Sequence, residues 1–246
     1  MIAVPYHLGR RAVEVGRGPL VILDGLQQPC VMVEGTGGVA GINSLLAQEV
    51  AVHDRPALVL AGNCSSCVGT LSALDDPGIV WLDAHGDFNT PETTISGAVE
   101  GMSLAIATGH CHREWMARPV PEENVVLGAT RSLDPLEEVR LRASKVVLAS
   151  LDALPRAVDL LAPRVKTIYL HVDLDVLDPG ISPGVNFSEA GGITPDQLFG
   201  AVKHVIATGK LGAAAITNFN PDRDREDRTL RIARDLVAVL SCPPAS

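Results

Sequence analysis

An acidic segment with the spacing of metal ligands follows one apolar run of the sequence. The run 79–82 leads into Asp83-Ala-His85-Gly-Asp87. On an extended chain alternate side chains point the same way, so these two carboxylates and the imidazole begin on one face. Such side chains converge as the ligands of a metal ion do. This segment is the strongest chemical signal in the sequence.

A second segment has the same form. The apolar run 167–172 leads directly into Asp173-Leu-Asp175, with Asp178-Pro179 close behind. Four aspartates brought together from the two segments cannot all stay ionised without compensating cations, because burying unpaired charge is costly. Two unrelated acidic loops are the alternative, but the shared placement favours a divalent metal. Oxygen ligands with one imidazole suit Mn²⁺ better than a metal that prefers thiolates.

The elements that hold these segments alternate along the chain. Short apolar runs alternate with amphipathic stretches of helical length, which favours a parallel sheet between layers of helices. We expect eight strands, at 2–6, 30–34, 57–61, 79–82, 125–128, 146–148, 167–172 and 212–217. We expect helices near 41–52, 67–74, 101–107, 136–142, 153–161, 195–207 and 227–240. The predicted fold class is therefore α/β, with three layers, a mainly parallel sheet and a single domain over residues 1–246. Ligands of such sheets gather beyond the carboxyl ends of the strands.

Composition excludes several classes of protein. The 246 residues are 46% hydrophobic and 20% charged, too apolar for a chain that stays unfolded. A net charge of −9 argues against a nucleic-acid-binding surface as the main function. The sequence contains no run of 18 or more apolar residues, so it predicts no membrane span. The scattered cysteines favour a reducing cytoplasm; they are Cys30, Cys64, Cys67, Cys111 and Cys242.

Three further motifs have competing interpretations. The glycine-rich stretch 35–41 follows an apolar run, but its spacing and the absence of a following acidic residue favour a plain turn over a dinucleotide site. The pair Cys64-Ser-Ser-Cys67 is compatible with redox chemistry, half a zinc site or buried thiols. His110-Cys-His112 lies past a glycine at a predicted helix end, where exposed polar residues are more common than a metal site.

In their order along the chain these segments resemble the binuclear manganese ureohydrolases, the family that includes arginase, agmatinase and formimidoylglutamase. The stretch 83–97 is similar to the family's D-A-H-x-D segment with its arginase-type continuation, and 171–179 is similar to its S-x-D-x-D-x-x-D-P segment. Residues 191–194 and 220–221 fit later signatures. The resemblance implies the three-layer arginase fold in a homo-oligomer, a trimer or hexamer. Together with the composition, we expect a cytoplasmic protein with no membrane or nucleic-acid partner.

The resemblance also implies a role for each matching residue. Two metals, expected to be Mn²⁺, would be bridged by Asp83 and Asp173 and held by the set Cys64, Asp83, His85, Asp87, Asp173 and Asp175. A hydroxide shared by the cations would attack the amidino carbon of the substrate. The implied catalytic residues are Glu100, Asp87 and Asn218. The implied substrate contacts are Asn89, Thr94 and Ser96 for an α-carboxylate and Asp134 and Glu137 for an α-amino group.

Three positions depart from the family's pattern. Cys64 stands where the first-metal histidine is expected; a thiolate there favours a softer ion such as Zn²⁺ and weakens the first Mn²⁺ site. Glu100 replaces a proton-shuttling histidine, which the chemistry of glutamate tolerates. Asn218 replaces the glutamate that binds guanidinium, and a neutral amide holds a cation less well than a carboxylate.

Cys64 and the residues that follow Asp87 are also similar to the hydroxyarginine amidinohydrolase branch of the family. An N-hydroxyguanidine is less basic than a guanidine, so Asn218 can donate to or accept from such a neutral group or a formimino group. We therefore expect hydrolysis of an arginine-like, hydroxyarginine-like or formimino amino acid. The alternatives are a metal-binding homologue that has lost or changed catalysis, and a redox protein that uses Cys64 and Cys67.

Overall fold

Eight strands form one sheet in which every neighbouring pair is parallel. The computed structural model describes residues 1–241, so Cys242 lies outside the described residues. The strand order is β4-β1-β5-β10-β9-β6-β7-β8. The strands are β1 (Ile2–Val4), β4 (Val31–Met32), β5 (Ala57–Ala61), β6 (Pro77–Leu82), β7 (Val125–Gly128), β8 (Val147–Ala149), β9 (Thr167–Asp173) and β10 (Leu211–Thr217). All eight predicted strands are confirmed, and a separate hairpin pairs β2 (Tyr6–His7) with β3 (Arg10–Arg11).

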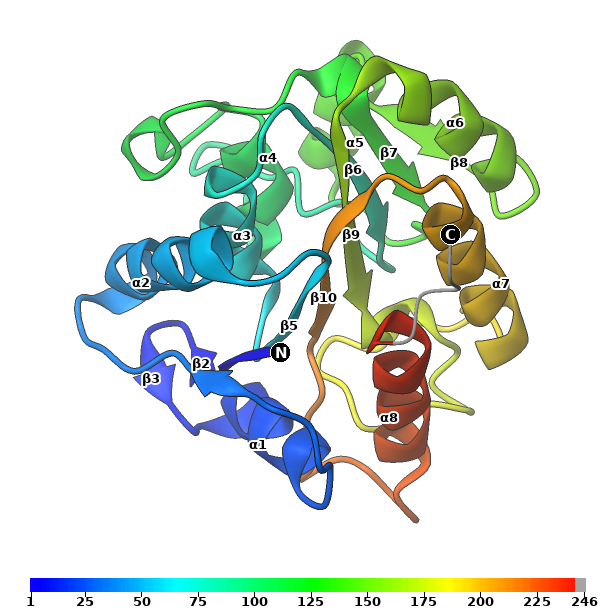
Figure 1. Cartoon of the computed structure of the whole chain (residues 1–246). Coiled ribbons are helices and arrows are strands. Elements are labelled where there is room, and N and C mark those ends of the chain that lie inside the picture. The colour runs from blue at the N-terminus through cyan, green and yellow to red at the C-terminus, as the bar shows by residue number, and fades with distance from the viewer. Residues whose placement is uncertain (242–246) are drawn as a thin grey trace.

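Helices cover both faces of this sheet (Figure 1). The helices are α1 (Gly18–Leu23), α2 (Gly38–Val52), α3 (Cys67–Ser72), α4 (Ser103–Ala107), α5 (Pro135–Ala143), α6 (Leu154–Leu161), α7 (Pro195–Ala207) and α8 (Arg228–Ser241). The seven predicted helices are confirmed. The short α1 was not predicted, because its six residues are too few to show a helical period.

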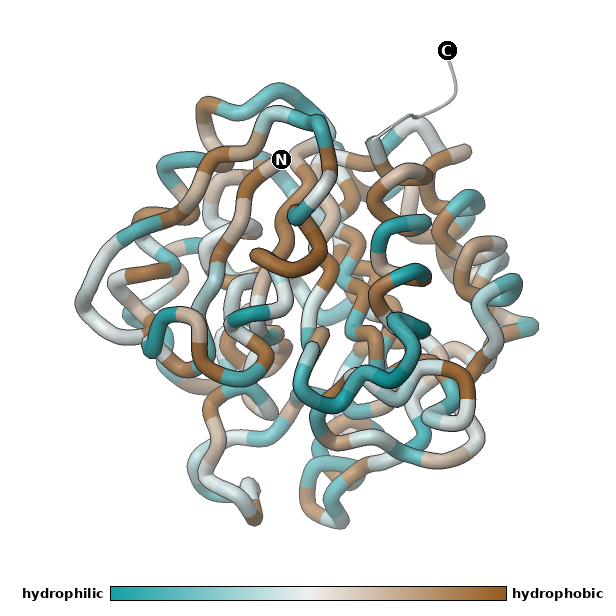
Figure 2. The backbone as a smooth tube through the Cα atoms, turned by 90° about the horizontal axis from the view of Figure 1, so that it is seen from below, coloured by the Kyte–Doolittle hydropathy of each residue, from teal (hydrophilic) through white to brown (hydrophobic). Residues whose placement is uncertain are grey.

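Two apolar cores lie on the two faces of the sheet. On one face α2, α3, α4 and α5 contribute side chains such as Leu46, Leu71 and Leu141. On the other face α1, α6, α7 and α8 contribute side chains such as Val202 and Leu236. The predicted three-layer α/β fold is therefore confirmed. Figure 2 shows hydrophobic and hydrophilic segments alternating along the backbone, including along single helices.

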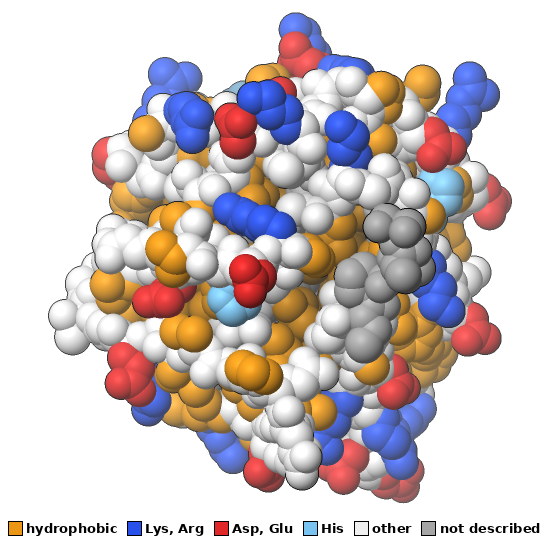
Figure 3. Space-filling view, in the orientation of Figure 1, with side chains coloured by type: hydrophobic (Ala, Val, Ile, Leu, Met, Phe, Trp, Pro, Cys, Tyr) orange, Lys and Arg blue, Asp and Glu red, His pale blue; other side chains and the backbone are white. Residues whose placement is uncertain are grey.

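One face of the molecule has mixed charge. Figure 3 shows acidic and basic side chains interspersed around one face, with apolar atoms between them. Among the helices of residues 1–241, none combines the length and the apolar character that crossing a membrane requires.

Candidate metal centre

The carboxyl ends of β6 and β9 bring the two acidic segments together. These strands are parallel neighbours, with Leu82 opposite Val172. Asp83 follows the end of β6, and Asp173 is the last residue of β9. The register therefore places the two carboxylates next to each other at one edge of the sheet, as the sequence predicted.

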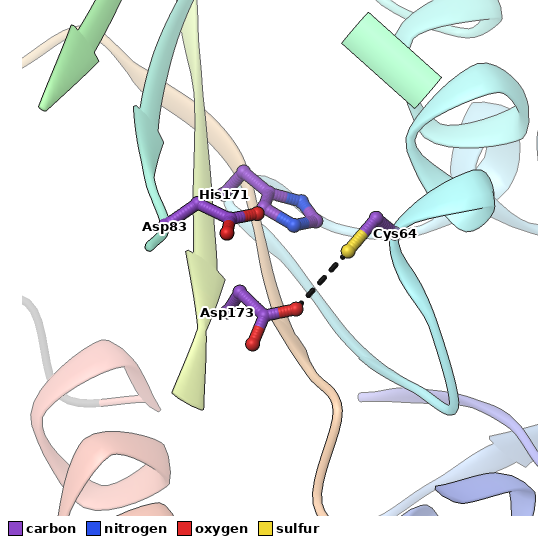
Figure 4. A group of neighbouring side chains, drawn as sticks. All are labelled: Cys64, Asp83, His171 and Asp173. Carbon is purple, nitrogen blue, oxygen red and sulfur yellow. Dashed lines mark hydrogen bonds between the residues drawn. The ribbon is translucent and has the colours of Figure 1, made fainter. Parts of the chain in front are cut away.

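Four buried side chains form what we call the first group: Cys64, Asp83, His171 and Asp173. Their ligand atoms all lie within 4.8 Å of one another. Cys64 comes from the 3₁₀ turn η2 (Cys64–Ser66) just beyond β5, and its Sγ donates to Oδ2 of Asp173 at 3.1 Å (Figure 4). A thiol, an imidazole and two carboxylates thus face one another.

Asp83, His85 and Asp175 form the second group, whose ligand atoms also lie within 4.8 Å of one another. Nδ1 of His85 is 3.1 Å from Oδ2 of Asp175 and 3.4 Å from Oδ1 of Asp83. Asp175 lies in the 3₁₀ turn η7 (Leu174–Val176) that follows β9. Because Asp83 belongs to both groups, two cations placed in them would share its carboxylate.

Asp87 belongs to neither group, although it lines the same cavity. Its backbone adopts a left-handed conformation, with φ of 48°, which turns the chain out of the extended form that predicted a common face. The Oδ2 atom of Asp87 is buried and has no hydrogen-bond partner among residues 1–241. A buried carboxylate oxygen without a donor is a position that a cation would satisfy.

Burial and crowding oppose ionisation of Asp87, Asp173 and Asp175, whereas the neighbouring imidazole of His85 lowers the pKa of Asp83 against the opposing effect of burial. Burial and the nearby charge of Asp83 raise the pKa of Asp173 to about 6. Burial, with neighbouring carboxylates, raises the pKa values of Asp87 and Asp175 well above the usual range. Burial alone would lower the pKa of His85, but Asp175 and Asp83 raise it to about 12. A site that disfavours this much negative charge fits divalent cations, and so does its donor chemistry.

Asn218 orients these carboxylates. It follows β10 with φ of 68°, a conformation that asparagine tolerates well. Its Nδ2 donates to Oδ1 of Asp173 at 2.9 Å and to Oδ2 of Asp175 at 3.1 Å. Its Oδ1 accepts from the backbone N–H of Asn186 at 3.1 Å. The amide is therefore fully occupied by the protein.

A cavity of about 390 Å³ opens over both groups. The lining includes most residues that were predicted to touch the substrate or to act on it, namely Asp87, Asn89, Ser96, Glu100, Asp134, Glu137 and Asn218. Thr94 is not among the lining residues, but its Oγ1 lies 3.4 Å from Oγ of Ser96. The predicted residues thus surround one cavity.

Glu137 stabilises the wall of the cavity through backbone hydrogen bonds. Its Oε1 accepts from the N–H of Phe88 at 2.8 Å, and its Oε2 accepts from the N–H of Asp134 at 3.1 Å. These bonds cap helix α5 and fix the loop after Asp87. Asn89 Nδ2 donates to Oδ2 of Asp134 at 2.9 Å, so the same carboxylate both begins the helix and faces the cavity.

Glu100 is held from behind by a histidine of the N-terminal hairpin. Glu100 lies in the 3₁₀ turn η3 (Val99–Met102), and its Oε2 accepts from Nδ2 of Asn63 at 3.2 Å. Nε2 of His7 is 3.4 Å from the same oxygen, and Nδ1 of His7 is 3.1 Å from Oε2 of Glu14. Glu100 raises the pKa of His7 above its usual value, against the opposing effect of burial.

The remaining motifs do not form sites. Cys64 and Cys67 are free, buried thiols with different partners, since Cys67 donates to the carbonyl of Ser103. Burial raises the pKa of both thiols, the opposite of what a redox pair needs. His110 pairs with Glu122 at 2.7 Å, as an ordinary surface contact. The redox and surface-metal interpretations therefore have no structural support in the described residues.

Comparison with known proteins decides the family. Residues 32–242 match the model of the Arginase family. The chain belongs to the arginase family. The arginase of Bacillus subtilis (strain 168) is 30% identical, over 98% of this chain and 96% of that protein. A crystal structure of arginase from Bacillus subtilis covers 97% of this chain and 96% of its own, with 29% identity and a TM-score of 0.86. Formimidoylglutamase from Bacillus subtilis shares the fold, with 19% identity, a TM-score of 0.80 and coverage of 98% of this chain and 85% of its own.

Membership of the arginase family confirms the predicted resemblance, the fold and the assignment as a hydrolase of the ureohydrolase type. The structure adds residues that sequence reasoning missed. His171 points into the first group, and its position two residues before Asp173 on β9 was the available signal, because such residues share a face. His7 and Arg131 left no such signal, since their contacts depend on how distant loops meet.

Arg131 ties together the two loops that border the cavity of this arginase-family protein. Its guanidinium donates to the carbonyl oxygens of Asp175 at 2.7 Å and Val176 at 3.1 Å. It also donates to the carbonyl oxygens of Glu189 at 2.8 Å and Ala190 at 3.1 Å. One side chain thus fixes the second group relative to the cavity wall.

Proposed function

We propose that this arginase-family chain hydrolyses a linear guanidino or amidino compound, with two divalent cations held by the first and second groups. The observation that supports this proposal is the convergence of the two groups, with a shared Asp83, at the floor of one cavity. Divalent cations bound there would make water acidic enough to serve as a nucleophile near neutral pH. Asp87, with its unpartnered oxygen, would complete the ligand set.

The cavity wall supports an amino-acid-shaped substrate. Asn89 and Ser96 present neutral hydrogen-bonding groups on one side, and Asp134 presents a carboxylate close to Asn89. A substrate α-carboxylate would accept from the former, and an α-ammonium would pair with the latter. In this proposal Thr94 acts through Ser96, and Glu137 acts by holding Asp134 rather than by touching the substrate.

Asn218 supports a weakly basic head group. Its donors and acceptor already bond to protein atoms, and it is a neutral amide at the position where the family's guanidinium-binding glutamate is expected. A hydroxyguanidine or formimino carbon needs less countercharge. We therefore place hydroxyarginine-like and formimino amino acids ahead of arginine as substrates.

Glu100 is the group placed to move a proton. It lines the cavity, and His7 with Asn63 holds its Oε2. A proton accepted on the free oxygen of Glu100 would be delivered to the leaving nitrogen. His7 would stabilise the carboxylate form before Glu100 accepts the proton and again after it has delivered it.

The cofactor identity follows from the donors. We expect Mn²⁺ in the second group, whose donors are oxygen and one imidazole nitrogen, and weak Mn²⁺ binding in the first group because of Cys64. Zn²⁺ is the alternative there. The whole chain would act as one catalytic domain in the cytoplasm, as a homo-oligomer. The half-exposed Val147 and Leu148 of the edge strand β8 support such association.

The test is a substrate panel on protein loaded with Mn²⁺, Zn²⁺ or both. Arginine, N-hydroxyarginine, agmatine and formimino amino acids are supplied, and urea, hydroxyurea, ammonia or formamide is measured. Release of one of these products by wild type, but not by Asp83→Asn, is expected. A metal-loaded wild type that turns over no compound would favour the alternative, a metal-binding homologue without this catalysis. The observation that favours this alternative is that the side-chain amide of Asn218 is already hydrogen-bonded to other protein groups.

A further inference from the structure

His171 is a fully buried imidazole of the first group to which the family's motifs assign no role. It lies on β9, two residues before Asp173, and its exposed fraction is 0%. Its ring belongs to the first group, within 4.8 Å of the donor atoms of Cys64, Asp83 and Asp173. Figure 4 shows the ring between Asp83 and Cys64. An imidazole is therefore present beside Cys64, although it comes from a different strand.

The ring is held in one orientation. Nδ1 of His171 lies 2.9 Å from the hydroxyl of Tyr169, two residues earlier on the same face of β9. The ring stacks on Trp81 with centroids 3.6 Å apart and an interplanar angle of 10°. Histidines that bind metals characteristically have one ring nitrogen fixed by an oxygen partner, which leaves the other nitrogen for the metal. Tyr169 supplies that partner here.

The other nitrogen faces the first group. Nε2 of His171 is 3.3 Å from Oγ1 of Thr217, and that hydroxyl is 3.2 Å from Oδ2 of Asp173 and 3.8 Å from Sγ of Cys64. Thr217 is thus a common neighbour of three donors. Among the donors themselves, Sγ of Cys64 is 3.1 Å from Oδ2 of Asp173, and all four ligand atoms lie within 4.8 Å of one another. The donors of a tetrahedral zinc site, with bonds of about 2.0 to 2.3 Å, lie roughly 3.3 to 3.7 Å apart.

We propose that His171 is the imidazole ligand of the first metal site, in a donor set of one thiolate, one imidazole and the carboxylates of Asp83 and Asp173. This inference rests on the proposed function, since it names the metal chemistry of the same centre. It joins two departures from the family's motifs: a cysteine replaces the expected histidine after β5, and a histidine replaces the serine of the S-x-D-x-D segment on β9. Compared with the family's motifs, the imidazole of the first site therefore comes from β9 and not from the turn after β5.

This donor set selects Zn²⁺ for the first site. Sulfur, nitrogen and carboxylate oxygen are the ligands that tetrahedral Zn²⁺ takes in proteins, whereas Mn²⁺ prefers oxygen. The second group has no sulfur donor. The two sites should therefore differ in metal preference, with Zn²⁺ in the first and Mn²⁺ in the second. Binding at the first site converts the Cys64 thiol to a thiolate and releases its proton.

The direct test is X-ray absorption at the zinc edge on wild-type protein with one equivalent of Zn²⁺, loaded in the presence of excess Mn²⁺. The expected zinc environment has one sulfur and one imidazole. A zinc with sulfur but no imidazole, or with imidazole but no sulfur, would overturn the proposal. This measurement needs no variant, so it stands whatever a substitution does to folding.

Variants then assign the imidazole, with Co²⁺ as an optical probe of thiolate coordination. His171→Asn should lower Co²⁺ affinity at the thiolate site at least about 100-fold, and Tyr169→Phe, which loses only the partner of Nδ1, about 10-fold. Cys64→Ser should abolish the thiolate band. His204→Asn, a surface histidine paired with Asp159, is the matched control and should change nothing.

The outcomes separate this inference from the proposed function. Unchanged Co²⁺ affinity in folded His171→Asn would show that the ring is only a core side chain bonded to Tyr169 and Thr217, and would leave the hydrolase proposal intact. Failure of wild type to bind Zn²⁺, Co²⁺ or Mn²⁺ at all would overturn both. Zinc bound by His171 without turnover of any amidino compound would support the site and contradict the hydrolase.

Discussion

Nε2 of His7 lies 3.4 Å from Oε2 of Glu100, so the N-terminal hairpin supports a carboxylate of the cavity wall. This contact has a consequence for stability. Glu100 raises the pKa of His7, which means that the folded protein favours the protonated ring. Its stabilising contribution is fully present below the unfolded pKa of about 6.5 and is lost as the pH rises through the folded value.

The first prediction concerns His7→Asn. The free energy of unfolding of wild type should fall, relative to that of the variant, as the pH rises above about 6.5. Urea denaturation of both proteins at several pH values between 6 and 9 measures the difference. Glu100→Gln should reduce the same pH dependence, because it removes the larger of the two charges that raise the pKa of His7 and leaves Glu14 in place. His204→Asn serves as the control; parallel curves for wild type and His7→Asn would refute the coupling.

The second prediction concerns Asp173→Asn. Asp173 lies in the first group and is 2.9 Å from Asn218, so loss of its charge should weaken metal binding at the centre as a whole. Folding should survive. Burial raises the pKa of Asp173 to about 6, so above that pH the metal-free wild type pays for a buried charge that the amide lacks.

The measurement for Asp173→Asn is the melting temperature with and without metal. Bound metal should raise Tm of wild type, because a ligand that binds only the folded state stabilises it. The variant should show no such rise, while its metal-free Tm at pH 8 equals or exceeds that of wild type. Calorimetry that finds one intact tight site in the variant would contradict a bridging role for Asp173.

Much of this centre could be predicted from local sequence because strands obey a period of two. The run 167–172 fixed the end of β9, and the register with β6 then had to bring Asp83 and Asp173 together. The same period puts His171 on the face of Asp173, so the information was present. The resemblance to the family assigns no ligand role to this position, because the family's motif has a serine where this chain has His171.

Other features could not be predicted from sequence. Asp87 lies outside the two groups although it lines their cavity, and its backbone is left-handed with φ of 48°, a turn that nothing in an extended-chain argument anticipates. His7 reaches Glu100 through a hairpin formed by two-residue strands, which are too short to show a pattern. Such contacts depend on how loops meet, and loops carry no periodic signal.

The third prediction concerns Gly86, between His85 and Asp87. A Cβ at this position would lie 2.7 Å from Oε1 of Glu137 and 2.7 Å from Cδ2 of Leu133, closer than side chains pack. Gly86→Ala should therefore cost about 1–3 kcal/mol of stability and should weaken metal binding by displacing the ligands on either side. Thermal melts and metal titration measure the two effects.

The control for Gly86→Ala is Gly200→Ala. Gly200 lies inside helix α7, where a Cβ would meet nothing within 4 Å. Alanine there should stabilise the helix by about 0.5–1 kcal/mol and should leave metal binding unchanged. If Gly86→Ala behaved like this control, the close approach of residue 86 to Glu137 would have no role in shaping the centre.

The last prediction concerns Arg131, whose guanidinium donates to the carbonyls of Asp175, Val176, Glu189 and Ala190. A lysine keeps the charge but lacks the planar fork of donors that reaches several carbonyls at once. Arg131→Lys should therefore cost about 1–3 kcal/mol of stability. It should raise KM more than it lowers kcat, because Glu189 lines the cavity whereas the metal ligands keep other bonds. Denaturation and steady-state kinetics on the substrate found by the panel measure these effects.

The matched control is Arg142→Lys, since Arg142 pairs with Glu138 on the exposed face of α5, where such pairs contribute at most about 1 kcal/mol. Equal effects of the two substitutions would mean that Arg131 does not hold the loops in their binding conformation.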